Sequence, residues 1–417
     1  MLSAEEGESS TKEAISTRPF IGTFKFRESH KKEVFGCAFN QFIKWPNTQI
    51  AAAVGGNFVH IYEFPETPHK INKLFDLPFS SDYEELFYSV AWCRDGDEVK
   101  VVAGGDSGLL YVWDFAEKKL ERTLTGCNNH INDIRTCPTT STLIAMCSND
   151  LTARIFDVRA ATCLFVLAGR TSHHQRIFSV DWAPNGSHVV TVSEDHLILN
   201  WDLSTSEAKE HLEACLKDLD DGKEIRDFEH YKGNQLLENA RGIVNPDKKA
   251  LFIVNPSHRI NSLHHQCIDC VRTIAAGPNR DQVYHFTKSV VSKCHIRCWR
   301  FGSHDDRVEK PSDGEPCVSH VELFRKNIPI GEISFNKFAV DPQRKWLVSG
   351  GDTGTLHFFD MRDFEGTASK FDIEVPLNMP RQVDFCDGGH IIFVVGNKEC
   401  MCRLDRVKPD EEDPKDT

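Results

Sequence analysis

The sequence contains no apolar run that approaches the roughly eighteen residues a membrane-spanning helix needs. Its first stretch, MLSAEEGESSTKEAIS, is acidic and polar, whereas a secretory signal peptide is basic and then apolar. We therefore expect an intracellular chain without a membrane contact. An excess of basic residues is also missing, since 49 Lys and Arg face 62 Asp and Glu, for a net charge of −13. This charge disfavours binding to a nucleic-acid backbone and would attract a basic partner, although it also simply keeps a protein soluble.

Signatures of catalysis are absent as well. The sequence has no phosphate loop, no nucleophile elbow and no H-E-x-x-H motif. Two glycine-rich stretches, AGGDSG from Ala103 and SGGDTG from Ser349, resemble phosphate cradles but are not followed by a helical pattern, so we read them as turns between strands. We expect a protein that is not an enzyme and that needs no cofactor.

Paired cysteines at disulfide spacings are not evident either. The 15 cysteines are an odd number spread over 417 residues, and reduced thiols that pack in the core are the favoured interpretation. Two pairs, Cys267 with Cys270 and Cys294 with Cys298, could each supply half of a zinc site. Both lie in strand-like runs, where a spacing of three places the first pair on opposite faces. We therefore favour core packing and no metal.

What the sequence does contain is a repeat. Stretches such as LLYVWDF and LILNWDL end on an aromatic residue followed by Asp, and weaker versions occur elsewhere. The seven ending positions are Tyr62, Trp113, Phe156, Trp201, Trp299, Phe359 and Leu404. Successive positions differ by 51, 43, 45, 98, 60 and 45 residues, which fits a period near 44 with insertions.

A period of about 40 to 45 residues that closes on an aromatic-Asp pair is typical of WD repeats, each of which forms one four-stranded blade of a β-propeller. We predict an all-β protein with one seven-bladed propeller over residues 19–408, carrying an insertion at 203–262 between blades four and five. Residues 1–18 and 409–417 are charged and poor in apolar side chains, so we expect disordered tails.

The fourth repeat predicts the strands of one blade. FSVDWAP reads as the inner strand, HVVTVS as the second and LILNWDL as the third, with the tight turn EDH between the last two. The hydrogen-bonded set usual in WD repeats would be His174, Asp195 and Trp201, with a hydroxyl group from Thr191 or Ser193. We expect these residues to be structural. The third repeat offers a less complete set, His130, Asp150 and Phe156.

The insertion begins with STSEAKEHLEACLKDLDD. Ser204 and Glu207 have capping-box spacing, and apolar residues follow at helical period, so we predict an amphipathic helix that protrudes from blade four or five. It could cover the flank of the propeller, which is the favoured interpretation, or dock a partner.

Aromatic residues near the ends of the inner strands, such as Phe39 and Trp92, mark a register shared by all blades. The positions four residues earlier should ring one mouth of the central channel, and they are Phe35, Tyr88, Asn132, Phe178, Asp269, Ser334 and Arg381. Phe335 adds an aromatic ring beside Ser334. Strands favour aromatic residues in general, but these rings could also form a cage for a methylated ammonium group.

The chain resembles the embryonic ectoderm development and extra sex combs family, a core subunit of Polycomb repressive complex 2, as a divergent member. The resemblance covers nearly all of residues 30–408, and its motifs agree in order and spacing. They are VFGCAFN at Val34, FYSVAW at Phe87, HINDIR at His130, IDCVR at Ile268, RQVDF at Arg381 and the closing RLDR.

The resemblance implies a nuclear, non-catalytic subunit with two tasks. The first is reading trimethyl-lysine on the histone three tail, with cage residues at Phe35, Tyr88 and Phe335 and a matching arginine at Arg381. Ser334 stands where the family has Trp, so a weaker cage is implied, whereas Phe178 is expected to be packing. The second task is holding the complex together, with a helix of the SET-domain methyltransferase of the Enhancer of zeste type in a groove on the opposite face, and with further subunits.

A different use of the same scaffold stays open. The chain could be an adaptor of another complex, such as a ubiquitin ligase receptor or a histone chaperone. Receptors for phosphorylated degrons need several arginines at the mouth. The predicted mouth has Arg381 alone.

Overall fold

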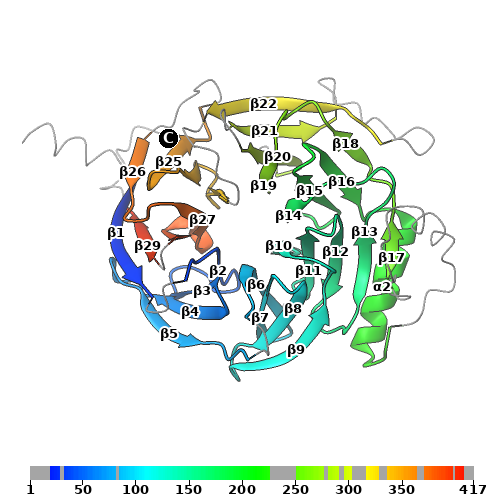
Figure 1. The fold of residues 1–417 in the computed structure, drawn as a ribbon, viewed down its shortest axis with the longest axis horizontal. Coiled ribbons are helices and arrows are strands. Elements are labelled where there is room, and N and C mark those ends of the chain that lie inside the picture. Colours follow the sequence, from blue (N-terminus) through cyan, green and yellow to red (C-terminus); the bar gives the residue numbers. More distant parts are fainter. Residues whose placement is uncertain are drawn as a thin grey trace, which may run out of the picture.

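The computed structural model describes residues 19–28, 32–80, 84–225, 250–276, 280–290, 295–302, 316–327, 336–363, 371–397 and 400–407. Within these residues the strands form seven sheets, arranged as a ring around a central channel (Figure 1). This confirms the predicted seven-bladed propeller. No helix in these ranges is long and apolar enough to cross a membrane.

Each sheet is one blade, and its strands are best named by their distance from the channel. The inner strands are β2 (Gly36–Phe39), β6 (Phe87–Asp95), β10 (Ile131–Thr136), β14 (Ile177–Trp182), β19 (Ile268–Ala276), β23 (Ala339–Val340) and β27 (Pro380–Phe385). The second strands are β3 (Gln49–Gly55), β7 (Glu98–Gly105), β11 (Leu143–Ser148), β15 (His188–Ser193), β20 (Gln282–Ser289), β24 (Trp346–Gly350) and β28 (Ile391–Gly396).

The two outer positions complete each blade. The third strands are β4 (Phe58–Phe64), β8 (Leu109–Asp114), β12 (Ala153–Asp157), β16 (Ile198–Asp202), β21 (His295–Phe301), β25 (Thr355–Asp360) and β29 (Cys400–Arg406). The outermost strands are β5 (Asn72–Asp76), β9 (Lys119–Thr125), β13 (Cys163–Leu167), β18 (His258–Ile260), β22 (His320–Asn327), β26 (Phe371–Glu374) and β1 (Phe20–Arg27). A short 3-10 turn, Asp387–Gly389, precedes β28.

Burial along the strands follows from this arrangement. The second strand β11 is buried at every residue because neighbouring blades cover both faces, whereas the outermost β9 alternates between exposed and covered residues. Indole groups join neighbouring blades near the channel: Trp92 Nε1 donates to Ala38 O at 2.9 Å, and Trp182 Nε1 donates to Arg135 O at 2.9 Å. These bonds give a physical reason for the Trp near the end of the inner strand in blades two and four.

The ring is closed by strands from both ends of the described chain. β1 pairs antiparallel with β29, from Phe20 opposite Arg406 to Arg27 opposite Cys400. The sheet of blade seven therefore has the order β1-β29-β28-β27. The repeat pattern did not predict β1, because a single outer strand carries no aromatic-Asp ending.

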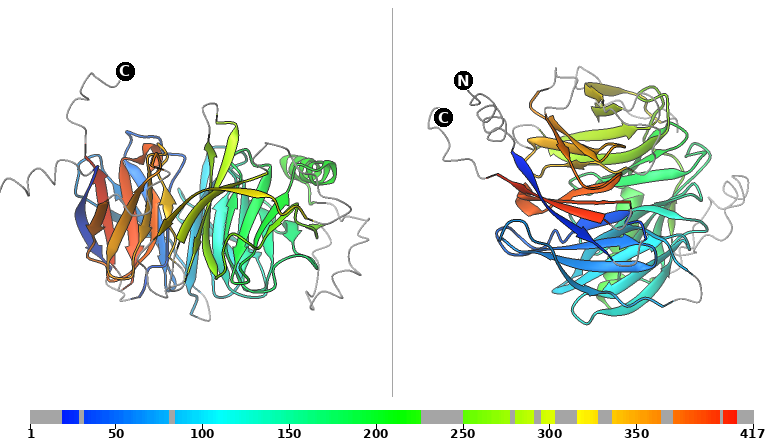
Figure 2. Two further views of the ribbon diagram at one scale, coloured as in Figure 1. Left: turned by 90° about the horizontal axis from the view of Figure 1, so that it is seen from above. Right: turned by 60° about the vertical axis from the view of Figure 1, so that its left-hand side comes forward.

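The predicted helix is α2 (Ser206–Asp220), on the outside of the ring (Figures 1 and 2). Its N-cap is Thr205, whose hydroxyl group accepts a bond from Ala208 N at 3.3 Å, so the prediction of Ser204 as the cap is wrong by one residue. Ser204 instead donates its hydroxyl to Asp202. Emerging after blade four, α2 packs against blade three: His211 bonds Leu164 O at 2.9 Å, and Cys215 lies in the same core cluster as Phe165.

The chain after α2 adds a strand that the repeat does not predict. β17 (Leu251–Ile253) runs parallel to β13 and gives blade three a fifth strand, and only then does β18 complete blade four. The predicted insertion at 203–262 thus contains β18, the outermost strand of blade four. The two glycine-rich stretches lie at the β7–β8 and β24–β25 turns, as predicted.

The cysteines that the structure describes are buried, apart from Cys267. Cys270 and Cys298 belong to one buried cluster in blades five and six, and Cys267 is partly buried. Burial raises the pKa of the Cys267 thiol to about 12. Cys294 lies outside the described residues.

Candidate functional site

The residues predicted to line one mouth of the channel fall at a repeated irregularity of the backbone. In five inner strands of the described residues the ladder to the second strand shifts near its start. The residues passed over are Tyr88, Asn132, Phe178, Asp269 and Arg381. A bulged residue is released from pairing and its side chain is redirected. We call these five residues and Phe35, which directly precedes β2, the upper mouth.

Phe35 and Tyr88 form a right-angled pair of rings between blades one and two. Their centroids are 5.2 Å apart and their planes meet at 78°, and both residues are half-buried. Gly36 permits this approach, because a Cβ atom there would lie 2.6 Å from Tyr88 O. The two rings are thus perpendicular walls with partly open faces.

His130 and Asp106 extend the wall on the far side of Tyr88. The Tyr88 and His130 rings are stacked with centroids 6.0 Å apart. Asp106 Oδ1 accepts a bond from Tyr88 Oη at 3.4 Å and lies 3.0 Å from His130 Nε2. Burial, followed by the Asp106 charge, raises the pKa of Tyr88 to about 12. His130 was predicted to belong with Asp150, but it pairs with Asp106 at the upper mouth.

Arg381 closes the other side of Phe35. Its guanidinium carbon is 5.6 Å from the centroid of the Phe35 ring, within the range of a cation–π contact. One of its terminal nitrogens lies 3.4 Å from Glu33 Oε2. Three blades, one, two and seven, therefore meet at this corner.

The remaining described positions of the upper mouth are occupied differently. Phe178 is only 2% exposed and lies under the Arg176 guanidinium, which is 5.4 Å from its ring centroid. Asn132 donates to Ile177 O and Asn149 Oδ1, both at 2.7 Å. Asp269 is fully buried with Lys288 at 2.7 Å. These three side chains are held within the protein and leave the Phe35 and Tyr88 corner as the aromatic part of the mouth.

The two blade-six positions, Ser334 and Phe335, lie outside the described residues. The next residue, Asn336, is described. Its backbone N donates to Asp269 Oδ2 at 3.3 Å and its side chain donates to Gly350 O at 2.9 Å.

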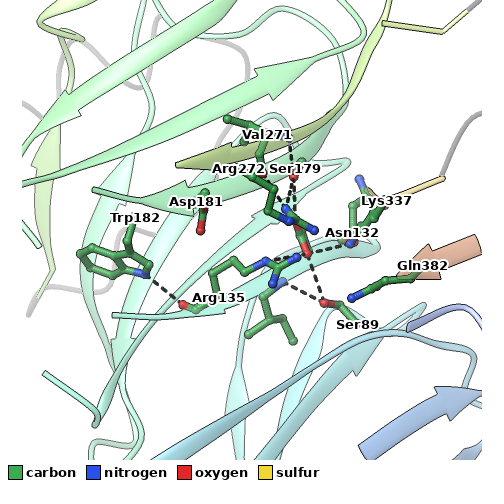
Figure 3. A network of polar contacts seen from close by, with 12 residues as sticks. Ser89, Asn132, Arg135, Ser179, Asp181, Trp182, Val271, Arg272, Lys337 and Gln382 are labelled. Atoms are coloured by element: carbon green, nitrogen blue, oxygen red, sulfur yellow. Dashed lines mark hydrogen bonds and ion pairs between the residues drawn. The ribbon is translucent and has the colours of Figure 1, made fainter. Parts of the chain in front are cut away.

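Below the upper mouth a polar network crosses the channel (Figure 3). Lys337 of blade six reaches blade three, where its Nζ bonds Asn132 O at 2.8 Å and Asp133 Oδ1 at 2.7 Å. Ser179 donates to the other Asp133 oxygen at 2.7 Å, and Arg272 is 3.6 Å from it. Burial raises the pKa of Asp133, but Lys337 and Arg135 outweigh it and the net direction is downward. We call these residues the channel network.

A cavity of about 370 Å³ opens where the inner strands end, on the far side of the channel network. Its lining includes Trp92, Phe385, Arg135, Asp181 and Asp384. Burial raises the pKa of Asp181 to about 7 and that of Asp384 to about 6, with Arg135 opposing both shifts. Each carboxylate also accepts a backbone bond from the next blade, from Thr273 N and Phe39 N respectively, both at 2.7 Å.

The structural set of blade four is shifted by one residue from the prediction. His173, not His174, is the buried imidazole: its Nδ1 lies 3.1 Å from Asp195 and its Nε2 lies 2.8 Å from Thr191 Oγ1. Trp201 Nε1 donates to the same Thr191 oxygen at 2.9 Å. His174 is exposed, and its backbone N donates to Asp195. The prediction for His174 is therefore wrong.

Blade five has a second set of this kind, which was not among the predicted ones. His264 Nε2 lies 2.8 Å from Thr287 Oγ1, and Trp299 Nε1 donates to the same oxygen at 3.0 Å. The signal was present in the sequence, because Thr287 and Trp299 precede and follow a turn in the manner of Thr191 and Trp201. The larger separation of twelve residues in place of ten concealed it.

Comparisons with known proteins agree with this architecture. Residues 118–157 and 161–202 match the WD domain, G-beta repeat family. The chain is 34% identical to Polycomb protein mes-6 of Caenorhabditis elegans, over 95% of this chain and 93% of that protein. It is 24% identical to Polycomb protein esc of Drosophila melanogaster, over 80% and 71% of the two chains. The chain belongs to the extra sex combs family of Polycomb proteins.

A solved structure shares the fold of this Polycomb protein. It is a chain of Chaetomium thermophilum Polycomb repressive complex 2 in a complex with H3K27me3 and H3K27M. The TM-score is 0.72 at 15% identity, and the match covers 95% of this chain and 99% of that one.

Proposed function

We propose that this Polycomb protein is a non-catalytic nuclear scaffold subunit that binds an Enhancer of zeste type methyltransferase and reads trimethyl-lysine on the histone three tail. The main support for this proposal is the Phe35–Tyr88 corner, where two rings from different blades lie at 78° to each other with their centroids 5.2 Å apart. A trimethylammonium group spreads its charge over methyl groups, which need apolar contact, and ring faces supply both that contact and electrostatic attraction.

The surroundings of the corner support a cationic ligand. Asp106 holds the Tyr88 hydroxyl, and Glu33 balances the charge of Arg381, whose guanidinium lies over Phe35. The protein as a whole carries a charge of −13, which attracts a basic histone tail over longer distances. The Chaetomium complex with the similar fold was solved with H3K27me3, a ligand of the class proposed here.

Phe335 supplies a further wall in this proposal, and Ser334 leaves the site short of the ring found in the family. Each cation–π face contributes about 0.5 to 2 kcal/mol, depending on how well water is excluded. We therefore expect recognition of the mark to be weaker by about 1 kcal/mol than in a four-ring cage.

The test is a titration of trimethylated and unmodified histone three tail peptides against the wild-type chain, Tyr88→Ala and Tyr284→Ala. Tyr284 is a half-buried tyrosine toward the other end of blade five, and it serves as the matched control. Wild type and Tyr284→Ala should prefer the trimethylated peptide, and Tyr88→Ala should lose about 1 kcal/mol of that preference. Equal affinities for both peptides in all three proteins would remove the reader role.

The scaffold role is tested separately. A propeller can bind an amphipathic partner helix in a groove, so tagged protein should copurify with a SET-domain methyltransferase from nuclear extract. Tyr88→Ala should retain that partner, because the upper mouth is not the proposed groove. Recovery of a ubiquitin ligase or a histone chaperone in place of the methyltransferase would replace this function with an adaptor role.

A further inference from the structure

A cationic pocket lies in blade five, apart from the upper mouth corner and from the channel. Its volume is about 340 Å³, at the low end of the range for small-ligand sites. The described residues that line it include no acid, and they are His264, His265, Gln266, Ser289, His295, Arg297 and Arg325. Such a concentration of basic groups is unexpected on a protein with a net charge of −13.

Two arginines face each other across this pocket. Arg297 in β21 and Arg325 in β22 are directly opposite partners of the ladder, an arrangement that like charges make unfavourable. One carboxylate serves both: Glu322 Oε2 lies 2.8 Å from Arg297, and Glu322 Oε1 lies 3.3 Å from Arg325. Glu322 balances one of the two arginine charges, so one positive charge remains without a partner of opposite sign among these three side chains.

Arg297 has unused hydrogen-bonding capacity. Its side chain is only 10% exposed, and its buried Nε has no hydrogen-bond acceptor within the described part of the chain. A buried donor without an acceptor is costly, and an anion in the pocket would supply one. Burial, opposed by Glu322, lowers the pKa of Arg297.

Among the residues that the structure describes, no carboxylate is bonded to the buried imidazole of blade five. In blade four the buried His173 lies 3.1 Å from Asp195, four residues after Thr191. Blade five keeps the contacts of His264 and Trp299 with Thr287, but the residue four places after Thr287 is Val291, which lies outside the described residues. Burial, then the charges of Arg297, His295 and Arg325, holds the pKa of His264 well below its usual value.

We infer that this pocket binds a phosphate monoester, with Arg297 and Arg325 as its principal ligands and His264 at its base. Arginine guanidinium groups bind phosphate oxygens with paired, charge-assisted hydrogen bonds. A phosphate monoester offers three strong acceptor oxygens, whereas a carboxylate offers two, so it suits a pair of guanidiniums with an unused donor better. The group could come from a free small phosphate or from a phosphorylated side chain of a partner.

The experiment is calorimetric titration of the full chain, at constant ionic strength, with three probes: inorganic phosphate, a short phosphoserine peptide and its glutamate counterpart. We expect saturable binding of phosphate and of the phosphopeptide, at least about tenfold tighter than the glutamate peptide. A phosphopeptide that binds more tightly than inorganic phosphate identifies a phosphorylated partner, and equal affinities identify a free small phosphate.

Variants make the assignment specific. Arg297→Gln and Arg325→Gln should each weaken phosphate binding by about tenfold or more, because each removes a charge-assisted contact. Arg325 is 48% exposed, so Arg325→Gln stays informative if Arg297→Gln does not fold. The matched control is Arg362→Gln, which removes an equally charged, exposed arginine from blade six.

Tyr88→Ala should bind phosphate like wild type, which separates this site from the proposed histone site. Absence of saturable phosphate binding by wild type, equal binding of the glutamate peptide, or unchanged binding by both pocket variants would each overturn the assignment.

Discussion

Two adjacent histidines at the start of blade four have different surroundings. His173 is buried and bonded through both ring nitrogens, to Asp195 and to Thr191. His174 is exposed. Burial raises the pKa of Asp195, but the contacts with His173 and two backbone hydrogen bonds outweigh it and lower the pKa to about 2. The network therefore depends on one imidazole of the pair.

This difference gives a direct test. His173→Ala should lower the free energy of unfolding by about 1 to 3 kcal/mol, because Thr191 and Asp195 would each lose a hydrogen-bond partner in a buried site. His174→Ala is the control and should change it by less than about 0.5 kcal/mol. Urea unfolding followed by tryptophan fluorescence measures both. Equal losses in the two variants would mean that the network does not stabilise the blade.

Residues of the candidate site could be predicted where they occupy the same position in successive blades. Phe35, Tyr88 and Arg381 were found from a shared register, and the structure brings them together. His130 and Asp106 were not found as mouth residues, because their contact joins two different blades and no spacing along the chain encodes it.

Elements differ in how well local sequence defines them. The strands of blade four were predicted within about two residues because alternation and turn residues bound them closely. The bulges of the inner strands were not predicted, since a register shift is a relation between two strands. The same limit applies to β17, which joins blade three through pairing with β13.

The N-terminus of α2 offers a second test. Thr205→Ala should destabilise the helix by about 1 kcal/mol, because its hydroxyl satisfies the otherwise unbonded Ala208 N–H. The matched variant Ser204→Ala should have a smaller effect on the helix, since Ser204 bonds Asp202 outside it. Hydrogen exchange of the α2 amides reports the local stability. Faster exchange in Ser204→Ala than in Thr205→Ala would restore the capping role first predicted for Ser204.

At the scale of the whole molecule, closure of the ring joins its two ends. Phe20 on β1 is 1% exposed, stacks on Phe358 at 5.5 Å and contacts Phe385 at 6.1 Å, so it links blades six and seven. The Arg406 guanidinium lies 4.8 Å from its ring centroid. A single strand from the start of the described chain thereby completes the last blade and joins it to blade six.

Removing that anchor should open the ring. Phe20→Ala should cost about 3 to 5 kcal/mol of unfolding free energy, because it leaves a cavity between two blades. Ile21→Ala, at a neighbouring side chain that is 42% exposed, should cost less than about 1 kcal/mol. Thermal unfolding monitored by circular dichroism compares the two. A Phe20→Ala protein as stable as Ile21→Ala would show that β1 does not hold the ring closed.

By itself, the sequence determined the number of blades, the identity of most strands and the register of the mouth residues. These features follow from periodic patterns that each repeat carries within about 44 residues. Only the tertiary structure decided which side chains meet: the Phe35–Tyr88 corner, the Lys337–Asp133 pair across the channel and the Arg297–Arg325 pocket. Their partners lie in different strands or blades, so bulges, strand pairing and ring closure bring them together.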